Sequence, residues 1–258
     1  MMENQNKYPC RVNLLGVDID PFTMQQTVDR TDDLISSGCF AHLIGVNADK
    51  VLQIRNSDEM HDCVSRCEIV NADGASMLIA AERLGVEIPE RVAGIDLMHE
   101  LCKLCQRRGY SVYLLGAKTE VVEKTREVLE ETYPGINICG IHDGYFTDSQ
   151  YDEIAEMLMR VEPQVVFVGI TSPKKERLIE HLRERGLKGV YVGVGGSFDV
   201  VSGSIPRAPK WMQQVRLEWL FRMMQEPKRL AKRYIVGNAR FMRLVSAERR
   251  MRKKGAGK

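Results

Sequence analysis

The sequence lacks any apolar run long enough to cross a bilayer. None of its stretches approaches the ~20 consecutive apolar residues that a membrane-spanning helix requires. The segment from Met1 to Pro9 is polar and has no apolar core of the kind found in signal peptides. We therefore expect a cytosolic protein that can reach a membrane only through its surface.

Two phosphate-binding motifs are also missing. No G-x-G-x-x-G follows the first expected strand, and no G-x-x-x-x-G-K-[ST] occurs anywhere in the chain. Both motifs bring backbone N–H groups close to the phosphates of a nucleotide. Their absence argues against a dinucleotide-dependent oxidoreductase and against a P-loop NTPase.

The seven cysteines are odd in number, and most lie within or beside apolar stretches, which is typical of reduced, packed thiols. Two pairs, Cys63-x3-Cys67 and Cys102-x2-Cys105, have a spacing that could suit a metal. Both pairs fall in helix-like sequence without a knuckle glycine or a nearby histidine pair. We therefore predict neither a metal nor a bound cofactor.

Charge is unevenly distributed along the chain. The formal net charge is +2, from 37 Lys and Arg against 35 Asp and Glu. Residues 205–258 hold 16 basic and 3 acidic side chains, a balance of +13, so residues 1–204 hold 21 and 32, a balance of −11. A basic C-terminal segment of this kind suits nucleic acid, an anionic membrane surface or a phosphorylated substrate.

Short apolar runs alternate with amphipathic segments over most of the 258 residues, which hold 44% hydrophobic side chains. The expected strands are Val12–Ile19, Phe40–Asn47, the run that ends at Asp73, Ser111–Leu115, Asn137–Ile141, Gln164–Val168 and Gly189–Val194. The expected helices are Pro21–Ser37, Ala48–Cys67 with a break near Asn56, Ser76–Leu84, Leu97–Arg108 capped by Asp96, Thr119–Thr132, Gln150–Val161 and Pro173–Arg185. This alternation predicts an α/β fold: a Rossmann-like parallel sheet with helices on both faces over residues 8–204, followed by a basic helical appendage over residues 205–258.

The run Ile69-Val70-Asn71-Ala72 stops at Asp73 and Gly74, just before a helix-like stretch. A carboxylate at the end of a buried strand lies where parallel α/β sheets bind ligands, and it could act as a general base. Asn and Asp before Gly also form ordinary turns and helix caps. The local pattern therefore leaves both roles for Asp73 open.

Polar or small residues also follow the other expected strands: Asn47, Gly116, His142, Thr171 and Gly195–Asp199. Because the carboxyl ends of parallel strands gather at one edge of a sheet, we expect these residues to converge with Asp73. Gly195-Gly196-Ser197 would let the backbone approach a ligand closely, although glycine pairs are also common in turns. His142 is a candidate acid or base, although a lone histidine at a strand end is more often structural.

The stretch Ser172-Pro173-Lys174-Lys175-Glu176 predicts a helix start with proline in its first turn. Free N–H groups and the helix dipole at such a start favour a phosphate, and the two lysines add positive charge. Alternatively, Ser172 is only a helix cap and both lysines are solvated.

The C-terminal segment predicts basic amphipathic helices interrupted at Pro227. Its first apolar stripe consists of Trp211, Val215, Trp219, Leu220, Met223 and Met224. Basic helices with interleaved aromatic residues suit an anionic membrane interface, but the stripe could equally pack on the domain while the arginines are solvated.

Ten short stretches together resemble the WecG/TagA/CpsF glycosyltransferase family. They are Asn71–Gly74, Pro89–Leu97, Val112–Gly116, Tyr133–Gly135, Gly144–Phe146, Ser172–Glu176, Gly193–Asp199, Arg207–Met212, Leu217–Leu220 and Gln225–Arg229. They run in family order from about residue 10 to residue 245, and jointly they are highly specific.

The resemblance implies an inverting, metal-independent bacterial transferase in teichoic acid-like synthesis. Its donor would be a UDP-linked N-acetylmannosamine-type sugar, and its acceptor a polyprenyl-diphosphate-linked N-acetylglucosamine at the inner face of the cell membrane. Asp73 aligns with the carboxylate regarded as the family's base. The resemblance leaves the oligomeric state open.

On this resemblance, donor-binding residues are expected to be Asn47, Asn71, Gly116, Ser172, Lys175, Gly195, Gly196 and Ser197. Arg216, Arg222 and Arg229 are our candidates for the acceptor diphosphate and the membrane surface, since guanidinium groups match phosphate oxygens.

The chain departs from the family pattern at two positions. Gly45-Val46-Asn47 stands where the family commonly has Thr-x-Asn, and Lys175 stands where the family usually has glutamine. A lost hydroxyl and a gained cation beside a nucleotide sugar could suit a different, even acidic, donor sugar. The alternative function is a nucleic-acid-binding protein that uses the +13 segment, which a salt titration against DNA would reveal.

Overall fold

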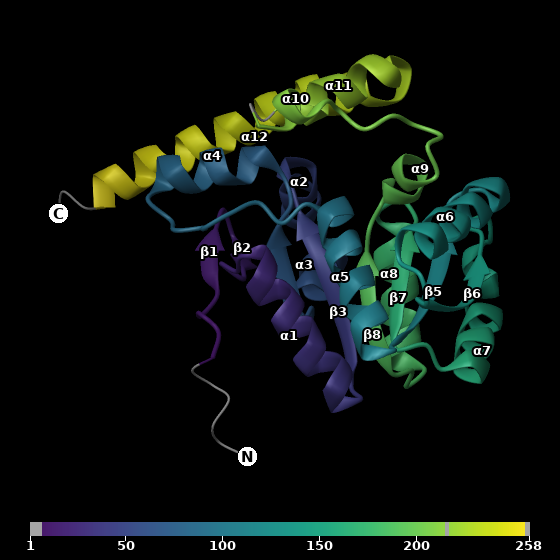
Figure 1. The fold of residues 1–258 in the computed structure, drawn as a ribbon. Helices are drawn as coiled ribbons and strands as arrows, with labels where there is room; N and C mark the ends of the chain where they lie inside the picture. Colours follow the sequence, from purple (N-terminus) through teal and green to yellow (C-terminus); the bar gives the residue numbers. More distant parts are fainter. Residues whose placement is uncertain (1–6, 215–216, 256–258) are drawn as a thin grey trace.

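The computed structural model describes residues 7–214 and 217–255, except the side chains of residues 213–214, 228–229 and 231–233. Its centre is a six-stranded, all-parallel sheet with the strand order β4-β3-β8-β7-β5-β6 (Figure 1). The strands are β3 Phe40–Val46, β4 Ile69–Ala72, β5 Ser111–Gly116, β6 Asn137–His142, β7 Val165–Gly169 and β8 Gly189–Gly193. The predicted α/β fold with a parallel sheet is confirmed.

Helices cover both faces of this sheet, as the alternation of apolar runs predicts. One face carries α1 Met24–Ser37, α5 Gly94–Arg108, α6 Thr119–Thr132 and α9 Ser197–Val201. The other carries α2 Ala48–Arg55, α3 Asp58–Ser65, α4 Ala75–Leu84, α7 Tyr151–Val161 with the short 3-10 helix η1 Asp148–Gln150 before it, and α8 Lys174–Glu184. Neighbouring strand residues alternate between the two layers, so Leu43 packs in the first and Ile44 in the second.

Local sequence signals explain where the helices begin and end. Thr23 and Gln26 form a capping box at the start of α1, and Gly38 ends that helix with a φ of 66°, a left-handed conformation that favours glycine. The expected break near Asn56 separates α2 from α3, and the Ser57 side chain caps α3. These predicted boundaries are confirmed.

The expected first strand, Val12–Ile19, is wrong. These residues form an antiparallel hairpin outside the main sheet, with β1 Val12–Leu14 and β2 Val17–Ile19. The turn residues Leu15 and Gly16 both have positive φ, 59° and 84°, as tight hairpin turns of this length require. A leucine rarely adopts that conformation, so the apolar run concealed the turn.

The expected helix cap at Asp96 is also wrong. Helix α5 begins two residues earlier, at Gly94, and Ala93 occupies the cap position. The Asp96 carboxylate instead accepts a hydrogen bond from Arg207 Nη2 at 2.7 Å. An acidic residue in the first turn of a helix is favourable without being its cap, because it complements the helix dipole.

Three helices follow the sheet domain: α10 Lys210–Gln214, α11 Glu218–Gln225 and α12 Pro227–Gly255. The expected break at Pro227 is confirmed. Helix α12 runs across α2 and α4 (Figure 1), and its Phe241 and Val245 are fully buried among the side chains of those helices. The separation of residues 205–258 as an appendage stays a prediction.

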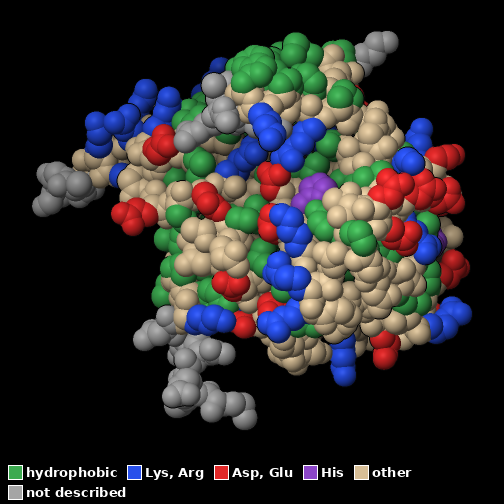
Figure 2. Space-filling model, in the orientation of Figure 1, with side chains coloured by type: hydrophobic (Ala, Val, Ile, Leu, Met, Phe, Trp, Pro, Cys, Tyr) green, Lys and Arg blue, Asp and Glu red, His purple; other side chains and the backbone are tan. Residues whose placement is uncertain are grey.

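The surface of these last helices is both apolar and basic. Trp211 and Met224 are 61% and 59% exposed. Figure 2 shows apolar side chains gathered over α10 and α11, and Lys and Arg side chains gathered over the far end of α12. Within the described ranges, no helix combines the length and apolarity needed to cross a membrane.

The burial of Phe241 makes α12 part of the core, and this can be tested. We expect Phe241→Ala to lower the free energy of unfolding by about 3–5 kcal/mol, because it leaves a cavity between α12 and the body. Ile235→Ala on the same helix, at a side chain that is 60% exposed, should change it by less than about 0.5 kcal/mol. Urea unfolding followed by circular dichroism measures both, and equal effects would contradict this packing.

Candidate functional site

Asp73 lies at the carboxyl end of β4, at the edge strand of the sheet. Its backbone N–H donates to the Val46 carbonyl of β3 at 2.9 Å, and its Oδ1 accepts from the Gly94 N–H at 3.2 Å. Burial raises the pKa of this carboxyl, while the Gly94 N–H and the positive charge of Arg91 oppose the rise. A partly desolvated carboxylate with a raised pKa is suited to accept a proton.

The absence of a side chain at Gly45 leaves room for Asp73, whereas Gly94 could carry a Cβ without a clash. A Cβ atom at Gly45 would lie 2.9 Å from the Asp73 Cβ, closer than such atoms come, so a side chain there would displace the carboxylate. A Cβ at Gly94 would lie 3.9 Å from Asp73 Oδ2, in ordinary contact. Gly45, one of the two positions that depart from the family pattern, therefore helps to set the position of Asp73 in this chain.

Asn47 and Asn71 differ in their relation to Asp73. Asn47 caps α2, and its Oδ1 accepts a hydrogen bond from the Lys50 N–H at 3.0 Å. A Cβ atom at Gly74 would lie 3.0 Å from the Asn47 Cβ, so Asn47 packs against the backbone that follows Asp73. Asn71 is buried within β4, and its Oδ1 accepts from Thr27 Oγ1 of α1 at 3.2 Å. The structure thus brings Asn47 beside the Asp73 turn, whereas Asn71 is used between the sheet and α1.

A chain of ion pairs links this edge to α11. Arg91 Nη2 lies 3.1 Å from Glu218 Oε2, and Arg207 Nε lies 3.8 Å from Glu218 Oε1. Sequence reasoning gave these three residues no role, although all of them lie in stretches that carry the family resemblance. Through Arg91, which lowers the pKa of Asp73, the network couples the start of α11 to the candidate base.

A buried ionic cluster lies at the start of α8. Its members are Lys50, Gln53, Ser172, Lys175 and Glu176. Glu176 accepts from Lys50 and lies 3.4 Å from Lys175 Nζ. Desolvation alone would raise the pKa of Glu176, but Lys175 and Lys50 hold it below its usual range. The cluster therefore holds two lysines around a single ionised carboxylate, and burial together with the charge of Lys175 lowers the pKa of Lys50.

Ser172 does not cap helix α8, and neither of the two lysines that follow it is free in solvent. Pro173 is the cap residue of α8, while Ser172 Oγ accepts from Lys50 at 2.8 Å and donates to Gln53 at 2.9 Å. Lys175 is buried, and Lys174 donates to the carbonyls of Gly144 and Phe146. The alternative in which Ser172 is a cap and both lysines are solvated is therefore wrong.

The end of β8 contacts the ionic cluster, and the glycine turn that follows it, Gly195–Ser197, contacts α11. A Cβ at Gly193 would lie 2.7 Å from Lys175 Nζ, so that ammonium rests against the backbone. Gly195 has a φ of 54°, and the Gly196 carbonyl accepts from Arg222 Nη2 at 3.4 Å. Ser197 Oγ is buried and donates to the Val194 carbonyl at 2.7 Å.

Two of the expected converging residues lie farther away. Gly116 ends β5 with a φ of 140°, and a Cβ there would lie 2.5 Å from the backbone of Gly169, so close strand packing explains this glycine. His142 ends β6, five strand positions from β4 and hence about 24 Å away. Its Nδ1 pairs with the Asp143 carbonyl, so the structure does not bring His142 to Asp73.

The three arginines expected at the acceptor diphosphate are described to different extents. Arg222, on α11, is the one that reaches the glycine turn. Arg216 lies outside the described residues, and the side chain of Arg229 is not among the described ones. Their roles stay predictions.

A cavity of about 990 Å³ lies outside the Asp73 region, between α2, α3, α8 and α12. Its lining includes Ser172 and Glu176 of the ionic cluster, Cys63 and Arg66 near the end of α3, and Arg240 of α12. The ionic cluster thus lies between this cavity and the turn after β8.

One comparison with known proteins bears on this site. The family model described as "Glycosyl transferase WecG/TagA/CpsF family" matches residues 12–255. The match includes the Asp73 turn, the ionic cluster, the glycine turn and α11.

Proposed function

The chain belongs to the WecG/TagA/CpsF glycosyltransferase family, and from this premise we propose that it moves an N-acetylmannosamine-type sugar from UDP to a lipid-linked acceptor. The family implies a glycosyltransferase of cell-surface polysaccharide synthesis. The proposed acceptor is N-acetylglucosamine on a polyprenyl diphosphate, and the proposed transfer inverts the anomeric centre without a metal. The observation that carries the proposal is Asp73, a carboxyl with a raised pKa at the carboxyl edge of the sheet.

Asp73 supports an in-line displacement. Its carboxylate takes the proton from the acceptor hydroxyl while that oxygen forms a bond to the anomeric carbon of the donor. The bond from this carbon to the UDP oxygen breaks, and the electron pair leaves with UDP. The absence of a side chain at Gly45 leaves space for the carboxylate, and the Gly94 N–H holds it by a hydrogen bond.

The donor is proposed to bind between Asn47 and the turn after β8. Lys50 and Lys175 exceed the single charge of Glu176 by one, and an excess buried cation favours an anionic ligand such as a diphosphate. The backbone of Gly195–Ser197 is proposed to approach that diphosphate. Asn71 and Ser172 form hydrogen bonds beside this region, whereas Gly116 packs against Gly169 farther away.

Arg222 is proposed to bind the acceptor diphosphate, together with Arg216 and Arg229. Its guanidinium already lies at the glycine turn. We expect Arg222→Ala to lower kcat/KM about 10- to 100-fold, since a hydrogen bond to a charged group contributes ~1.5–3 kcal/mol. A short-chain, soluble acceptor isolates this effect from membrane binding, and Arg240→Ala, at an exposed position on α12, is the control. Equal rates for the two variants would contradict this role.

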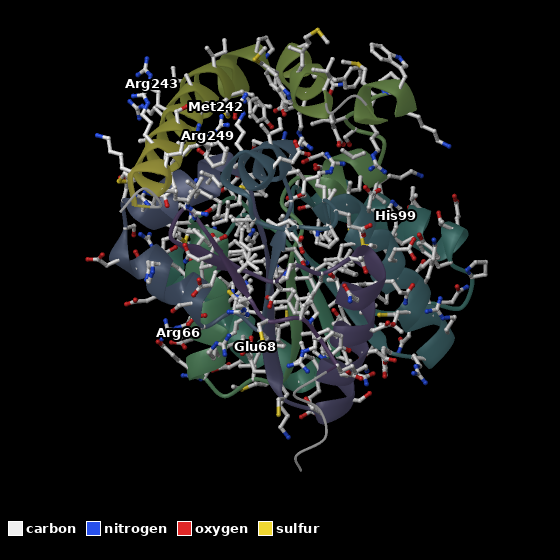
Figure 3. All side chains as sticks on the ribbon, turned by 90° about the vertical axis from the view of Figure 1, so that its left-hand side faces the viewer. Arg66, Glu68, His99, Met242, Arg243 and Arg249 are labelled. Carbon is white, nitrogen blue, oxygen red and sulfur yellow. The ribbon has the colours of Figure 1, made fainter. Side chains whose placement is uncertain are left out.

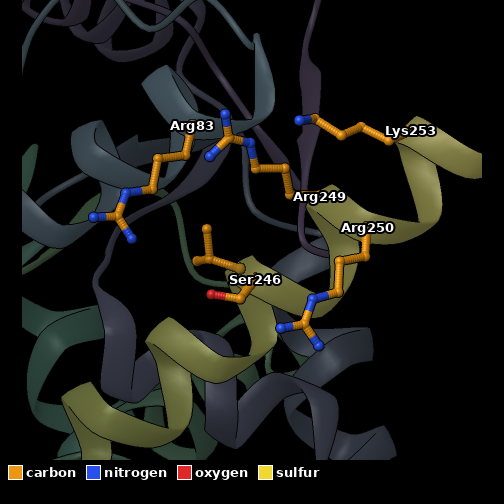
Figure 4. Close-up of a pocket in the computed structure, with 6 residues that line it drawn as sticks. Arg83, Ser246, Arg249, Arg250 and Lys253 are labelled. Carbon is orange, nitrogen blue, oxygen red and sulfur yellow. The ribbon is translucent and has the colours of Figure 1, made fainter.

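The far end of α12 is proposed to bind an anionic membrane surface. A hollow of about 240 Å³ between α4 and α12 is lined by four basic residues, Arg83, Arg249, Arg250 and Lys253, and by Val245 and Ser246 (Figure 4). Each basic residue near an anionic surface contributes ~1 kcal/mol. This basic surface supports our proposal that the protein binds peripherally to the inner face of the cell membrane.

The membrane proposal predicts that a variant can lose membrane binding and keep its rate of sugar transfer to a soluble acceptor. The double variant Arg249→Glu/Arg250→Glu should bind phosphatidylglycerol-containing vesicles on the order of 30-fold more weakly or worse, since at least two contributions of ~1 kcal/mol are lost. Its transfer to a soluble acceptor should be unchanged. Vesicle co-sedimentation at fixed salt measures the first, and undiminished binding would refute the docking surface.

A panel of UDP-sugars tests the proposed function. Each is incubated with the full chain and a lipid-diphosphate N-acetylglucosamine acceptor in a chelator-containing buffer, and UDP release is measured. We expect acceptor-dependent release with the N-acetylmannosamine-type donor. Release with another sugar alone would correct the donor, and no release with any donor would overturn the proposal.

A further inference from the structure

Three metal-binding side chains meet in the second helical layer, away from Asp73. They are His42 of β3, Cys63 of α3 and Cys67, which precedes β4, and all three are buried. Their ligand atoms all lie within 4.8 Å of one another, and Cys67 Sγ is 3.3 Å from His42 Nδ1. Ligands of a tetrahedral zinc ion, at 2.0–2.3 Å from the metal, are separated by about 3.3–3.8 Å. A small contraction would therefore close this group around an ion.

Glu180 is a candidate fourth ligand, although its carboxylate oxygens are not among the atoms that lie within 4.8 Å of one another. Glu180 Oε1 of α8 is 4.0 Å from His42 Nδ1, and Glu180 is buried. Arg66 Nη2 pairs with the other carboxylate oxygen at 2.8 Å, and Arg183 Nε lies 3.5 Å from Oε1. His42 Nε2 has no hydrogen-bond partner within the described part of the chain. The contact with Cys67 Sγ is made by Nδ1, so Nδ1 is the ring atom that the geometry favours as the ligand.

Charge balance around the group suits a divalent cation. The ion pairs beside it are formed by Glu68 and Glu180 with Arg66 and Arg183, and their charges sum to zero. Two thiolates add two negative charges, which a divalent ion neutralises.

An ion has a path to the group. Cys63, Arg66 and Glu180 all line the cavity of about 990 Å³. Figure 3 shows Arg66 and Glu68 at the end of the molecule away from α12 with its Met242 and Arg243. Cys67 and Asp73 are six residues apart along an extended segment, roughly 20 Å. An ion here would not reach the transferred sugar, so the site is compatible with metal-independent transfer.

We propose that His42, Cys63, Cys67 and Glu180 form a structural zinc site that ties α3 and α8 to β3. Sequence spacing alone does not reveal it, because the histidine comes from another strand and the glutamate from a helix more than a hundred residues later. Soft thiolates and an imidazole select zinc over magnesium or calcium.

The test uses the purified full chain, stripped with a chelator, incubated with Zn²⁺ and desalted before metal analysis by mass spectrometry. We expect about one zinc ion per chain, and less than about one tenth in Cys63→Ser and in Cys67→Ser. The double variant Cys102→Ser/Cys105→Ser is the matched control, since those thiols are also buried but belong to no group of three possible metal ligands among the described residues. It should keep its zinc. Glu180→Gln should weaken zinc binding by at least about tenfold.

A wild-type chain with less than about one tenth of a zinc ion, or equal zinc in wild type and Cys63→Ser, would overturn the site. Alkylation of the wild-type chain decides the matter if a serine variant does not fold. Zn²⁺ should slow alkylation of Cys63 and Cys67 about tenfold or more while leaving the exposed Cys10 and Cys39 unaffected. Equal rates with and without zinc would also overturn it.

Discussion

Asp73→Asn is expected to lower kcat for sugar transfer by ~10²–10⁴-fold, because a positioned general base contributes that much to a rate. The amide can still accept the hydrogen bond from the Gly94 N–H, so the turn after β4 should keep its shape. Burial of Asp73 opposes its charge, so loss of that charge should not destabilise the fold.

The control for Asp73→Asn is Asp58→Asn, at an exposed carboxylate in the first turn of α3. It should retain full activity. Circular dichroism and thermal unfolding establish that both variants fold, and UDP release with the preferred donor gives the rates. Near-normal turnover by folded Asp73→Asn would exclude the base.

Glu176→Gln is expected to lower the free energy of unfolding by about 3–5 kcal/mol. The substitution leaves Lys50 and Lys175 buried without the carboxylate between them, and an uncompensated buried charge is strongly destabilising. Adding Lys50→Met to this variant should recover part of the loss, because it removes one of the two cations. Glu184→Gln, at an exposed position on the same helix, should change stability by less than about 0.5 kcal/mol.

The same cluster gives a pH signature with a defined sign. The pKa of Glu176 is lowered in the folded state, so its stabilisation is fully present above the ordinary value of 4.5 and is lost as pH falls below it. Urea midpoints between pH 3 and pH 7 should therefore fall more steeply for wild type than for Glu176→Gln. Parallel curves would show that the carboxylate is not stabilised by the two lysines.

The parallel sheet and most element boundaries could be predicted because they depend on local signals. Apolar runs, the capping box at Thr23 and the glycine at position 38 act over a few residues. The hairpin at Leu15 could not, because a leucine with positive φ leaves no signal in an apolar run.

The position of Asp73 at a strand end could also be predicted, but its surroundings could not. Arg91 and Glu218 meet only because the loop before α5 and the start of α11 fold onto the same edge. The burial of Lys175 depends on partners far away in the sequence, since Lys50 comes from α2. Strand order likewise decided that His142 and Asp73 end up at opposite edges, and spacing along the chain does not encode it.

The pH dependence of kcat/KM, measured for wild type and Arg91→Met, tests the central claim that Asp73 is the base. The raised pKa of Asp73 predicts an acid limb with its midpoint above 3.8, the ordinary value for this carboxyl. Arg91 lowers the pKa of Asp73 and Glu218 raises it. Removing the arginine also leaves Glu218 with Arg207 as its remaining ion-pair partner, so both changes should move the midpoint to higher pH. A midpoint that stays in place in Arg91→Met, or a wild-type profile without an acid limb, would contradict the role of Asp73.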